Sequence, residues 1–172
     1  MRRVAAVVVM LLVAGGAACT SAPEGAPLVD DAEPGVTSRT LPGLQGGEVD
    51  LAGYRGTPLL INFFQHNCAP CLQEMPDLEA AYQAADGDFE IVGVASQDDP
   101  DQAQALADQL GVTWSLAADA DGGFFVDAGA NFLPTTLFVD AGGDIVDSHV
   151  GAMSSGDIAS LLDEHFGIDV PG

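Results

Sequence analysis

A Cys-x-x-Cys motif, Cys68 to Cys71, follows an apolar run directly and is the feature that most constrains this chain. Residues 58–64 are apolar at the positions that would face either side of a strand, which predicts a strand covered on both faces. The pattern after the motif is helical. Two cysteines that open a helix behind a buried strand are typical of a redox pair rather than half of a zinc site. A helix N-terminus also favours thiolate, so the pKa of the first thiol should fall below its free value of about 8.5.

The N-terminal segment has the pattern of an export signal. Arg2 and Arg3 precede an apolar stretch over residues 4–13, and small residues follow up to Cys19. The stretch is too short for a spanning helix. Because residues 16–19 resemble a bacterial lipobox, we expect a lipoprotein-type signal peptide over residues 1–18 and lipidation of Cys19. Ordinary cleavage after residue 18, which leaves a free thiol, is the alternative.

The rest of the chain divides into a tether and one domain. Residues 19–38 are rich in Pro, Gly, Ala and acids, and this composition predicts a flexible tether. Residues 39–172 suit a single domain with one core. Export places the chain where disulfides persist. Since Cys19 belongs to the lipobox, the only pair left in the mature protein is the one suited to exchange chemistry.

Charge excludes one class of partner. All 26 acidic residues follow residue 18, whereas only Arg39 and Arg55 of the four basic residues do, so the mature chain carries a net charge of −24 with histidine neutral. Such a surface repels nucleic acid and anionic lipid headgroups. We therefore expect no nucleic-acid partner.

The order of predicted elements gives the fold class. Hydrophobic periodicity and turn residues predict strands that alternate with helices and end in a hairpin and a helix. The strands are expected at 41–44, 48–51, 58–64, 89–95, 114–117, 135–140 and 144–150, and the helices at 69–85, 101–110, 124–128 and 157–166. This order predicts an α/β protein with a mixed central sheet, helices on both faces and an N-terminal β-hairpin extension. That is the architecture of a thioredoxin-like fold.

Five short motifs carry a family resemblance when taken in order. They are Ile61-Asn62-Phe63-Phe64, Cys68-Ala69-Pro70-Cys71, Glu74-Met75-Pro76, Leu133-Pro134-Thr135-Thr136 and His149-Val150-Gly151. On these motifs, residues 41–167 resemble the TlpA- and ResA-like extracytoplasmic thiol–disulfide oxidoreductases, a redoxin-related branch of the thioredoxin superfamily. The resemblance covers essentially the whole mature domain.

The two thiols have different expected roles. Cys68 lies nearest the helix N-terminus and is the expected attacking thiol, while Cys71 lies one turn on and is the expected resolving thiol. The alternative is a zinc half-site or a pair of inert buried thiols, but the chain has no second Cys pair for zinc. Glu74, three residues further on, faces the same side. The resemblance implies that it tunes thiol protonation, and a solvated helix Glu is the alternative reading.

The resemblance also assigns a client-binding loop. It implies that Pro134 forms a cis peptide bond facing the disulfide, with Leu133 and Thr135 beside it offering contacts to a client chain. An ordinary trans proline at a strand start is the alternative. Asn67 stands where the family usually has Trp, so it is expected to alter client contacts and redox potential. His66, if protonated, would stabilise a thiolate at Cys68, and an exposed loop histidine is the alternative.

These features predict an enzyme that cycles between dithiol and disulfide. The resemblance implies a reductant of client disulfides, such as those of apocytochrome c, recharged by a membrane-bound donor of the thioredoxin-reducing type. The expected location is extracytoplasmic, on the outer face of a bacterial membrane through the lipid anchor, and no cofactor or resident metal is expected. One alternative is an oxidase that inserts disulfides. Another is a copper metallochaperone that uses the two thiols with His66 and Met75.

Overall fold

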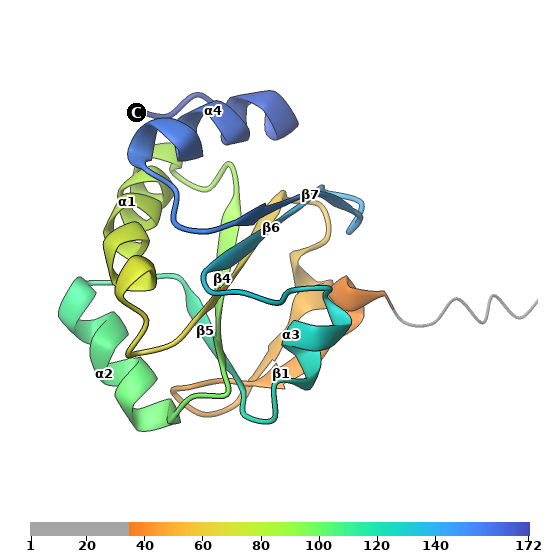
Figure 1. Cartoon of the computed structure of the whole chain (residues 1–172). Coiled ribbons are helices and arrows are strands. Elements are labelled where there is room, and N and C mark those ends of the chain that lie inside the picture. Colours follow the sequence, from red (N-terminus) through yellow and green to blue (C-terminus); the bar gives the residue numbers. More distant parts are fainter. Residues whose placement is uncertain (1–34) are drawn as a thin grey trace, which may run out of the picture. The chain divides into compact units, whose positions relative to one another are not determined.

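In the computed structural model, which describes residues 35–172, five strands form one mixed sheet in the order β5-β4-β3-β6-β7 (Figure 1). The central strand β3 (Leu59–Phe64) pairs in parallel with β4 (Glu90–Ser96) and antiparallel with β6 (Thr135–Val139). β5 (Ser115–Asp119) extends the sheet parallel to β4, and β7 (Ile145–Val150) extends it antiparallel to β6. The predicted mixed sheet and its closing hairpin are thus confirmed.

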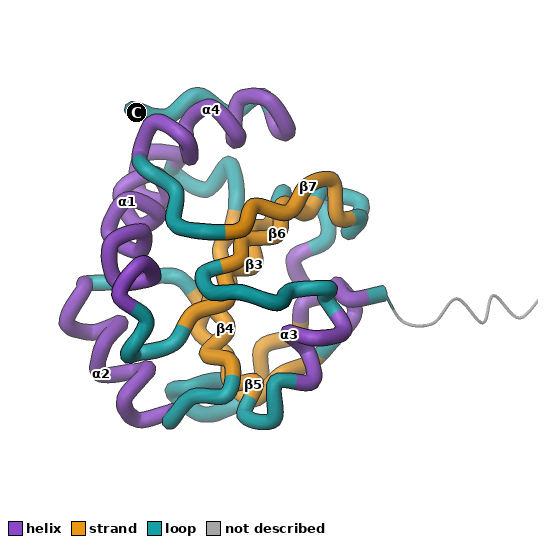
Figure 2. The backbone as a smooth tube through the Cα atoms, viewed as in Figure 1, coloured by secondary structure: helices purple, strands orange, loops and turns teal. Residues whose placement is uncertain are grey.

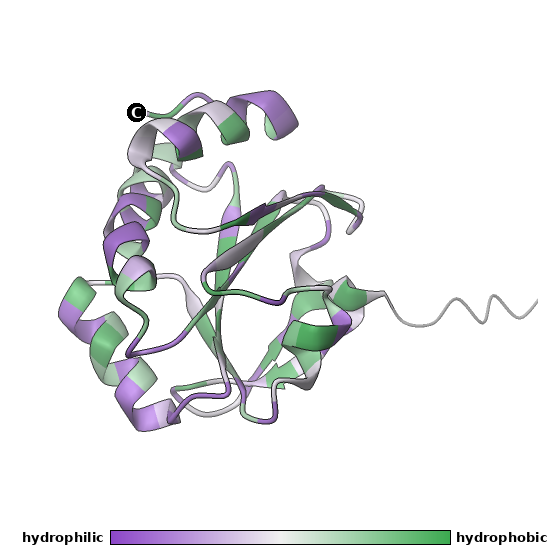
Figure 3. Ribbon diagram, viewed as in Figure 1, coloured by the Kyte–Doolittle hydropathy of each residue, from purple (hydrophilic) through white to green (hydrophobic). Residues whose placement is uncertain are grey.

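Helices cover both faces of this sheet (Figure 2). The helices α1 (Ala69–Ala85), α2 (Pro100–Leu110) and α4 (Ser155–Phe166) share one hydrophobic cluster with one face. The short helix α3 (Gly123–Asp127) packs on the other face. In α2 and α4, hydrophobic residues alternate with hydrophilic ones along the ribbon, as expected for helices with one buried side (Figure 3).

The N-terminal extension packs on the α3 side of the sheet. A hairpin of β1 (Thr40–Pro42) and β2 (Glu48–Asp50) is followed by the 3-10 turn η2 (Leu51–Tyr54). The segment that connects β1 to β2 lies beside β5, where the Leu44 N–H donates to the Leu116 carbonyl at 3.0 Å. The predicted hairpin is therefore present, and it lies alongside one edge strand of the sheet.

The apolar run after residue 58 is buried on both sides, as its pattern predicts. All six residues of β3 are buried. Leu60 and Phe64 point to the cluster that contains α1, whereas Ile61 and Phe63 point to the cluster that contains α3. The Phe63 ring lies 5.2 Å from the Phe124 ring, centroid to centroid. This double burial fixes the strand that leads into the Cys-x-x-Cys motif.

The helix that carries the motif has well-defined ends. Cys68 is its N-cap, and Asp86 ends it in the left-handed conformation at φ 48°. The helix continues across Pro76. Because proline lacks an N–H, one intrahelical hydrogen bond is missing at this point.

The N-terminal predictions fall largely outside the described residues. The signal peptide over residues 1–18, the lipidation site Cys19 and the tether up to residue 34 all lie there and stay predictions. The turn η1 (Val36–Ser38) already packs on the domain, because Thr37 is buried and donates its hydroxyl to the Gly143 carbonyl at 2.6 Å. Within residues 35–172, no helix combines the length and the apolar character needed to cross a membrane.

Candidate active site

Cys68 and Cys71 form a disulfide at the start of α1. Their sulfurs are 2.00 Å apart and their Cα atoms 5.3 Å apart. The strand β3 ends at Phe64, and the Cys68 N–H donates to the Gln65 carbonyl at 3.2 Å, which closes a turn through His66 and Asn67. The double-sided burial of β3 and this turn hold the disulfide at the edge of the sheet where β3 ends.

The two sulfurs differ in their access to solvent. Cys68 is partly exposed, whereas Cys71 is 0% exposed and belongs to the core cluster beneath α1. The Sγ of Cys68 also accepts the Cys71 N–H at 3.3 Å. A backbone N–H at a helix N-terminus stabilises negative charge on the sulfur that it contacts. This geometry suits Cys68 for attack on a client and Cys71 for resolution.

Glu74 is buried on the inner side of α1, not solvated. Its side chain is 0% exposed and faces the two central strands. Asn62 of β3 donates from Nδ2 to one carboxyl oxygen at 3.4 Å, and Thr136 of β6 donates its hydroxyl to the other at 3.4 Å. Asn62 and Thr136 are direct partners across the two strands and are themselves joined at 2.9 Å.

Burial changes the proton affinity of this carboxyl. Desolvation raises the pKa of Glu74 from 4.5 to about 7, against smaller lowering effects from hydrogen bonds with the Met153 backbone, Asn62 and Thr136. The Oδ1 of Asn62 is buried and has no hydrogen-bond partner. A protonated Glu74 has an O–H to donate, and a carboxylate does not. Near neutral pH the carboxyl can therefore both accept and release a proton one turn beyond Cys71.

The predicted client loop contains a cis peptide bond between Leu133 and Pro134. The resemblance implied this isomer. Leu133 is partly buried and contacts both hydrophobic clusters, and the Pro134 carbonyl accepts the Gly151 N–H at 2.9 Å. Thr135 is 0% exposed, and its hydroxyl donates to the Phe132 carbonyl at 2.8 Å. The Thr135 side chain is thus buried and holds the loop in place, whereas Leu133 keeps partial exposure to solvent.

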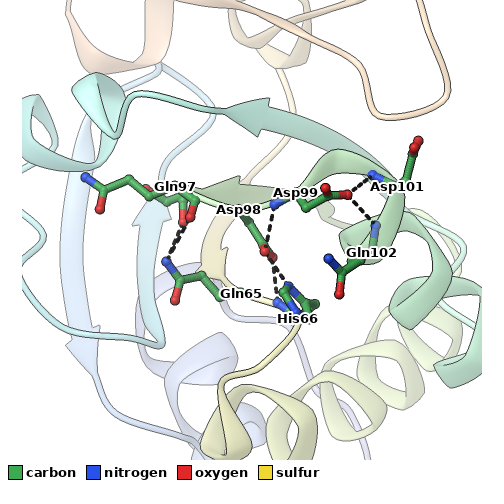
Figure 4. A network of polar contacts seen from close by, with 8 residues as sticks. Gln65, His66, Gln97, Asp98, Asp99, Asp101 and Gln102 are labelled. Atoms are coloured by element: carbon green, nitrogen blue, oxygen red, sulfur yellow. Dashed lines mark hydrogen bonds and ion pairs between the residues drawn. The ribbon is translucent and has the colours of Figure 1, made fainter.

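The turn before Cys68 is tied to the neighbouring strand end. Asn67 is exposed at the turn. His66 is held by Asp98 from the loop after β4 through both its backbone N–H and its ring Nδ1 (Figure 4). Sequence reasoning missed Asp98, and it missed the roles of Asn62 and Thr136. A polar Asn in an otherwise apolar strand was the available signal, because a buried polar group needs a partner.

No group of three or more His, Cys, Asp or Glu side chains placed to hold a metal ion occurs within residues 35–172.

Comparisons with known proteins agree with this arrangement. Residues 21–163 match the family model described as Redoxin. The chain is 31% identical over 125 residues to the thioredoxin-like protein YneN of Bacillus subtilis, which covers 70% of this chain and 72% of that protein. It is also 31% identical over 113 residues to the thiol-disulfide oxidoreductase ResA of Halalkalibacterium halodurans. That alignment covers 64% of each chain, so this chain spans slightly less than two thirds of that relative.

A solved structure shares the fold. It is a secreted Mycobacterium tuberculosis disulfide oxidoreductase, described as homologous to DsbE of E. coli. The two superpose with a TM-score of 0.68 at 24% identity, and the match covers 75% of this chain and 97% of the other. The fold is therefore thioredoxin-like, as the order of predicted elements indicated. With a disulfide at the start of α1 and a family match over most of its length, the chain belongs to the Redoxin family, as a thiol–disulfide oxidoreductase of the ResA- and TlpA-like branch.

Proposed function

We propose that this protein reduces disulfides of exported client proteins through a Cys68/Cys71 dithiol–disulfide cycle. The observation that carries the proposal is the asymmetry of the pair: Cys68 is partly exposed, while Cys71 is buried on the same side of α1 as the buried carboxyl of Glu74. The Cys68 thiolate attacks a client disulfide, forms a mixed disulfide and releases one client sulfur. Cys71 then gives its proton to Glu74 and attacks Cys68, which re-forms the enzyme disulfide and releases the second client sulfur.

The proposed direction of electron flow rests on Glu74. A negative charge beside the thiols disfavours a second one, so an ionised Glu74 destabilises the thiolates of the reduced protein. A less stabilised reduced form has a more negative potential and is a better reductant. Because the pKa of Glu74 is about 7, this repulsion grows as the pH rises through neutrality.

Client binding is proposed for the surface between two loops. On one side lies the cis-proline loop with Leu133, Pro134 and Thr135, and on the other lies Asn67 of the turn before Cys68. Proline has no N–H and Leu133 is only partly buried, so the loop suits an extended client segment that pairs through its backbone.

The cellular setting is proposed from the sequence. Lipidation of Cys19 would tether the enzyme to the outer face of the cell membrane, and a membrane-bound donor of the thioredoxin-reducing type would return it to the dithiol state. The proposed clients carry paired cysteines such as the haem-binding pair of an apocytochrome c. The similarity to the thiol-disulfide oxidoreductase ResA supports the exchange chemistry of the two thiols.

The test uses the reduced protein and a synthetic peptide that holds a Cys-x-x-Cys-His disulfide. We expect one peptide disulfide reduced per enzyme, no reaction with Cys68→Ser, and a stable mixed disulfide with Cys71→Ala. Turnover by Cys68→Ser would rule the mechanism out. Equilibration with glutathione separates the directions, because a potential near about −120 mV is typical of disulfide-inserting oxidases and one near about −270 mV of reductants.

The copper-chaperone alternative finds less support in the site. The Met75 side chain is 0% exposed in the core, and the ring Nδ1 of His66 is engaged by Asp98. Met75 therefore cannot reach a metal at the thiols without rearrangement, and only the Nε2 of His66 is left as a ligand atom. Titration of the reduced protein with Cu(I) separates the two functions, since tight stoichiometric binding together with poor peptide reduction would favour the chaperone.

A further inference from the structure

Three buried polar side chains, those of Asn62, Glu74 and Thr136, contact one another beneath α1. Asn62 donates from Nδ2 to one carboxyl oxygen of Glu74, and Thr136 donates its hydroxyl to the other, each at 3.4 Å. The same Nδ2 donates to the Thr136 hydroxyl oxygen at 2.9 Å. None of the three side chains is more than 1% exposed, so these contacts are made away from bulk solvent.

The hydrogen bonds in this group are directed toward the carboxyl. A carboxylate only accepts hydrogen bonds, and Asn62 and Thr136 both present donors to it. Because the Thr136 oxygen already accepts from Asn62, its own hydrogen is left to point at Glu74. The acceptor atom of the Asn62 amide, Oδ1, is buried without a partner. The group is therefore arranged for the ionised form of Glu74, since the protonated form would need an acceptor.

Strand pairing fixes both donors in this position. Asn62 and Thr136 are direct partners between β3 and β6. On the other side of β3, Asn62 lies opposite Gly93 of β4, which has no side chain to compete for the amide. The backbone of Met153, in the loop between β7 and α4, adds another hydrogen bond to the Glu74 carboxyl. Hydrogen bonds from three parts of the fold thus converge on one buried acid.

Burial and hydrogen bonds, rather than nearby charges, govern the ionisation of Glu74 in the oxidised protein. Neither β3 nor β6 carries a charged side chain. Within one turn on α1 the titratable groups are Cys71 and Asp77, and the half-buried ones on β7 and α4 are Asp147, His149 and His165. Burial raises the pKa of Glu74 and the hydrogen bonds lower it, with no contribution from these groups. Removal of a donor should therefore raise this pKa further.

Both side-chain donors have room to close on a charged carboxyl. Charge-assisted hydrogen bonds to a carboxylate are about 2.7–2.9 Å long, whereas Asn62 and Thr136 lie 3.4 Å from the Glu74 oxygens. A hydrogen bond to a charged group is also stronger than one to a neutral group. The two contacts should thus tighten as Glu74 loses its proton, and they should stabilise the carboxylate more than the acid.

We propose that Asn62 and Thr136 are positioning residues whose donors keep Glu74 ionisable in the core, and that they thereby set the pH range in which Cys71 resolves the mixed disulfide. This assignment deepens the dithiol cycle proposed above, and its second half rests on that cycle. A donor pair that the central strands hold rigidly would let one buried carboxyl take up and release a proton in every turnover.

The resolving step balances in the following way. Cys71 gives its S–H proton to the Glu74 carboxylate, and its sulfur forms a bond with the sulfur of Cys68. The bond between Cys68 and the client breaks, and the client sulfur leaves as a thiolate with the electron pair of that bond. Glu74 then releases its proton to solvent, and the two hydrogen bonds from Asn62 and Thr136 re-form on the carboxylate. The enzyme dithiol is oxidised by two electrons, and the client disulfide is reduced.

The first measurement needs no client. The oxidised full chain is labelled with ¹³C at the glutamate side-chain carboxyls, NMR follows the Glu74 signal across a pH series, and Glu74→Gln assigns that signal. For Thr136→Val we expect the midpoint to rise from about 7 by about one pH unit, because one hydrogen bond to the charged form is lost. Asn62→Leu should raise it further, since it removes a donor and also the amide that directs the Thr136 hydroxyl.

Two controls separate loss of the donor from a change in packing. Thr136→Ser keeps the hydroxyl and should keep the wild-type midpoint. Thr37→Val removes a buried hydroxyl that donates to the Gly143 carbonyl, far from Glu74 in the hydrogen-bond network, and should also leave the midpoint unchanged. An unchanged or lowered midpoint in Thr136→Val would overturn the proposal. If Asn62→Leu does not fold, Thr136→Val decides.

The second measurement follows the two half-reactions separately. The reduced full chain reacts with dithiodipyridine, an uncharged aromatic disulfide that the acidic surface does not repel. The first thiopyridone released reports attack by Cys68, and the second reports resolution by Cys71. In Thr136→Val the second phase should shift upward in pH with Glu74 and be roughly fivefold slower at about pH 7, while the first phase stays close to wild type. A raised Glu74 midpoint with an unshifted second phase would instead overturn the proton transfer from Cys71 to Glu74 in the proposed cycle.

Discussion

Replacing Glu74 by Gln should stabilise the oxidised protein at alkaline pH and leave its stability at acidic pH nearly unchanged. Burial raises the pKa of this carboxyl from 4.5 to about 7, so the folded state binds the proton more tightly than the unfolded chain does. As the pH rises from 4.5 toward 7, the unfolded chain releases its proton first, and the free energy of unfolding falls. Above this window the loss is complete, at about 3 kcal/mol.

Glutamine avoids that loss because it is neutral at every pH and has nearly the same shape. Its amide can donate to the buried Oδ1 of Asn62, which has no partner in the wild-type structure. The variant should therefore gain about 3 kcal/mol at about pH 8.5 and close to nothing at about pH 4. For a domain of this size the alkaline gain corresponds to a rise of roughly 10 °C in Tm.

Urea unfolding of the oxidised proteins across that pH range measures the difference directly. Glu164→Gln is the matched control, because Glu164 is exposed on α4 and the chemical change is the same. Its stability should follow that of the wild type at each pH. A Glu74→Gln advantage that does not vary with pH, or a wild type that is the more stable at alkaline pH, would refute the reasoning. The first result would mean that hydrogen bonds from Asn62 and Thr136 offset desolvation of the carboxylate, and the second that they outweigh it.

Two further predictions concern packing and capping. Gly93→Ala should destabilise the fold by about 1–3 kcal/mol, because a Cβ there would lie 2.4 Å from the Trp114 ring. Urea unfolding measures this loss, and Gly53→Ala is the control. No comparable loss is expected there, because a Cβ at Gly53 would have no atom within 4 Å. Ser154→Ala should lower the free energy of unfolding by about 1 kcal/mol, because the Ser154 side chain caps α4 and accepts the Asp157 N–H. Thermal unfolding should show a smaller change for the control Ser155→Ala, which lies next to the cap.

Periodicity within the sequence predicted the elements well because each pattern has one dominant physical cause. The apolar run of β3 indicated a strand buried on both faces, and it lies at the centre of the sheet with all six residues buried. The Cys-x-x-Cys pair was placed at a helix start, and Cys68 is the N-cap of α1. The resemblance implied a cis bond before Pro134, and the bond is cis. These features depend on local spacing or on a motif, both of which the sequence displays.

The environment of Glu74 was harder to predict because it depends on strand register. Spacing places Glu74 on the side of α1 that carries Cys71, but a helix position three residues on can be buried or solvated. What decides is that Asn62 and Thr136 pair directly across β3 and β6 under the helix and contact both carboxyl oxygens. An Asn in the middle of an apolar strand signals that some buried polar partner exists. It does not identify that partner until the neighbouring strand is known.

The contact between His66 and Asp98 follows from the sheet topology, but the sequence analysis did not use the topology to predict which loops meet. The strands β3 and β4 are parallel neighbours, and Phe64 stands opposite Ala95 at their carboxyl ends. Residues that leave two such strands emerge at the same edge of the sheet, which is where ligand and active sites of α/β folds form. His66 and Asp98 are 32 residues apart in the chain, yet each lies within three residues of that last pair. One helical turn then separates the two sulfurs: α1 begins at this edge, where Cys68 is partly exposed, and by Cys71 the helix has turned its side chain into the core, on the side that carries Glu74.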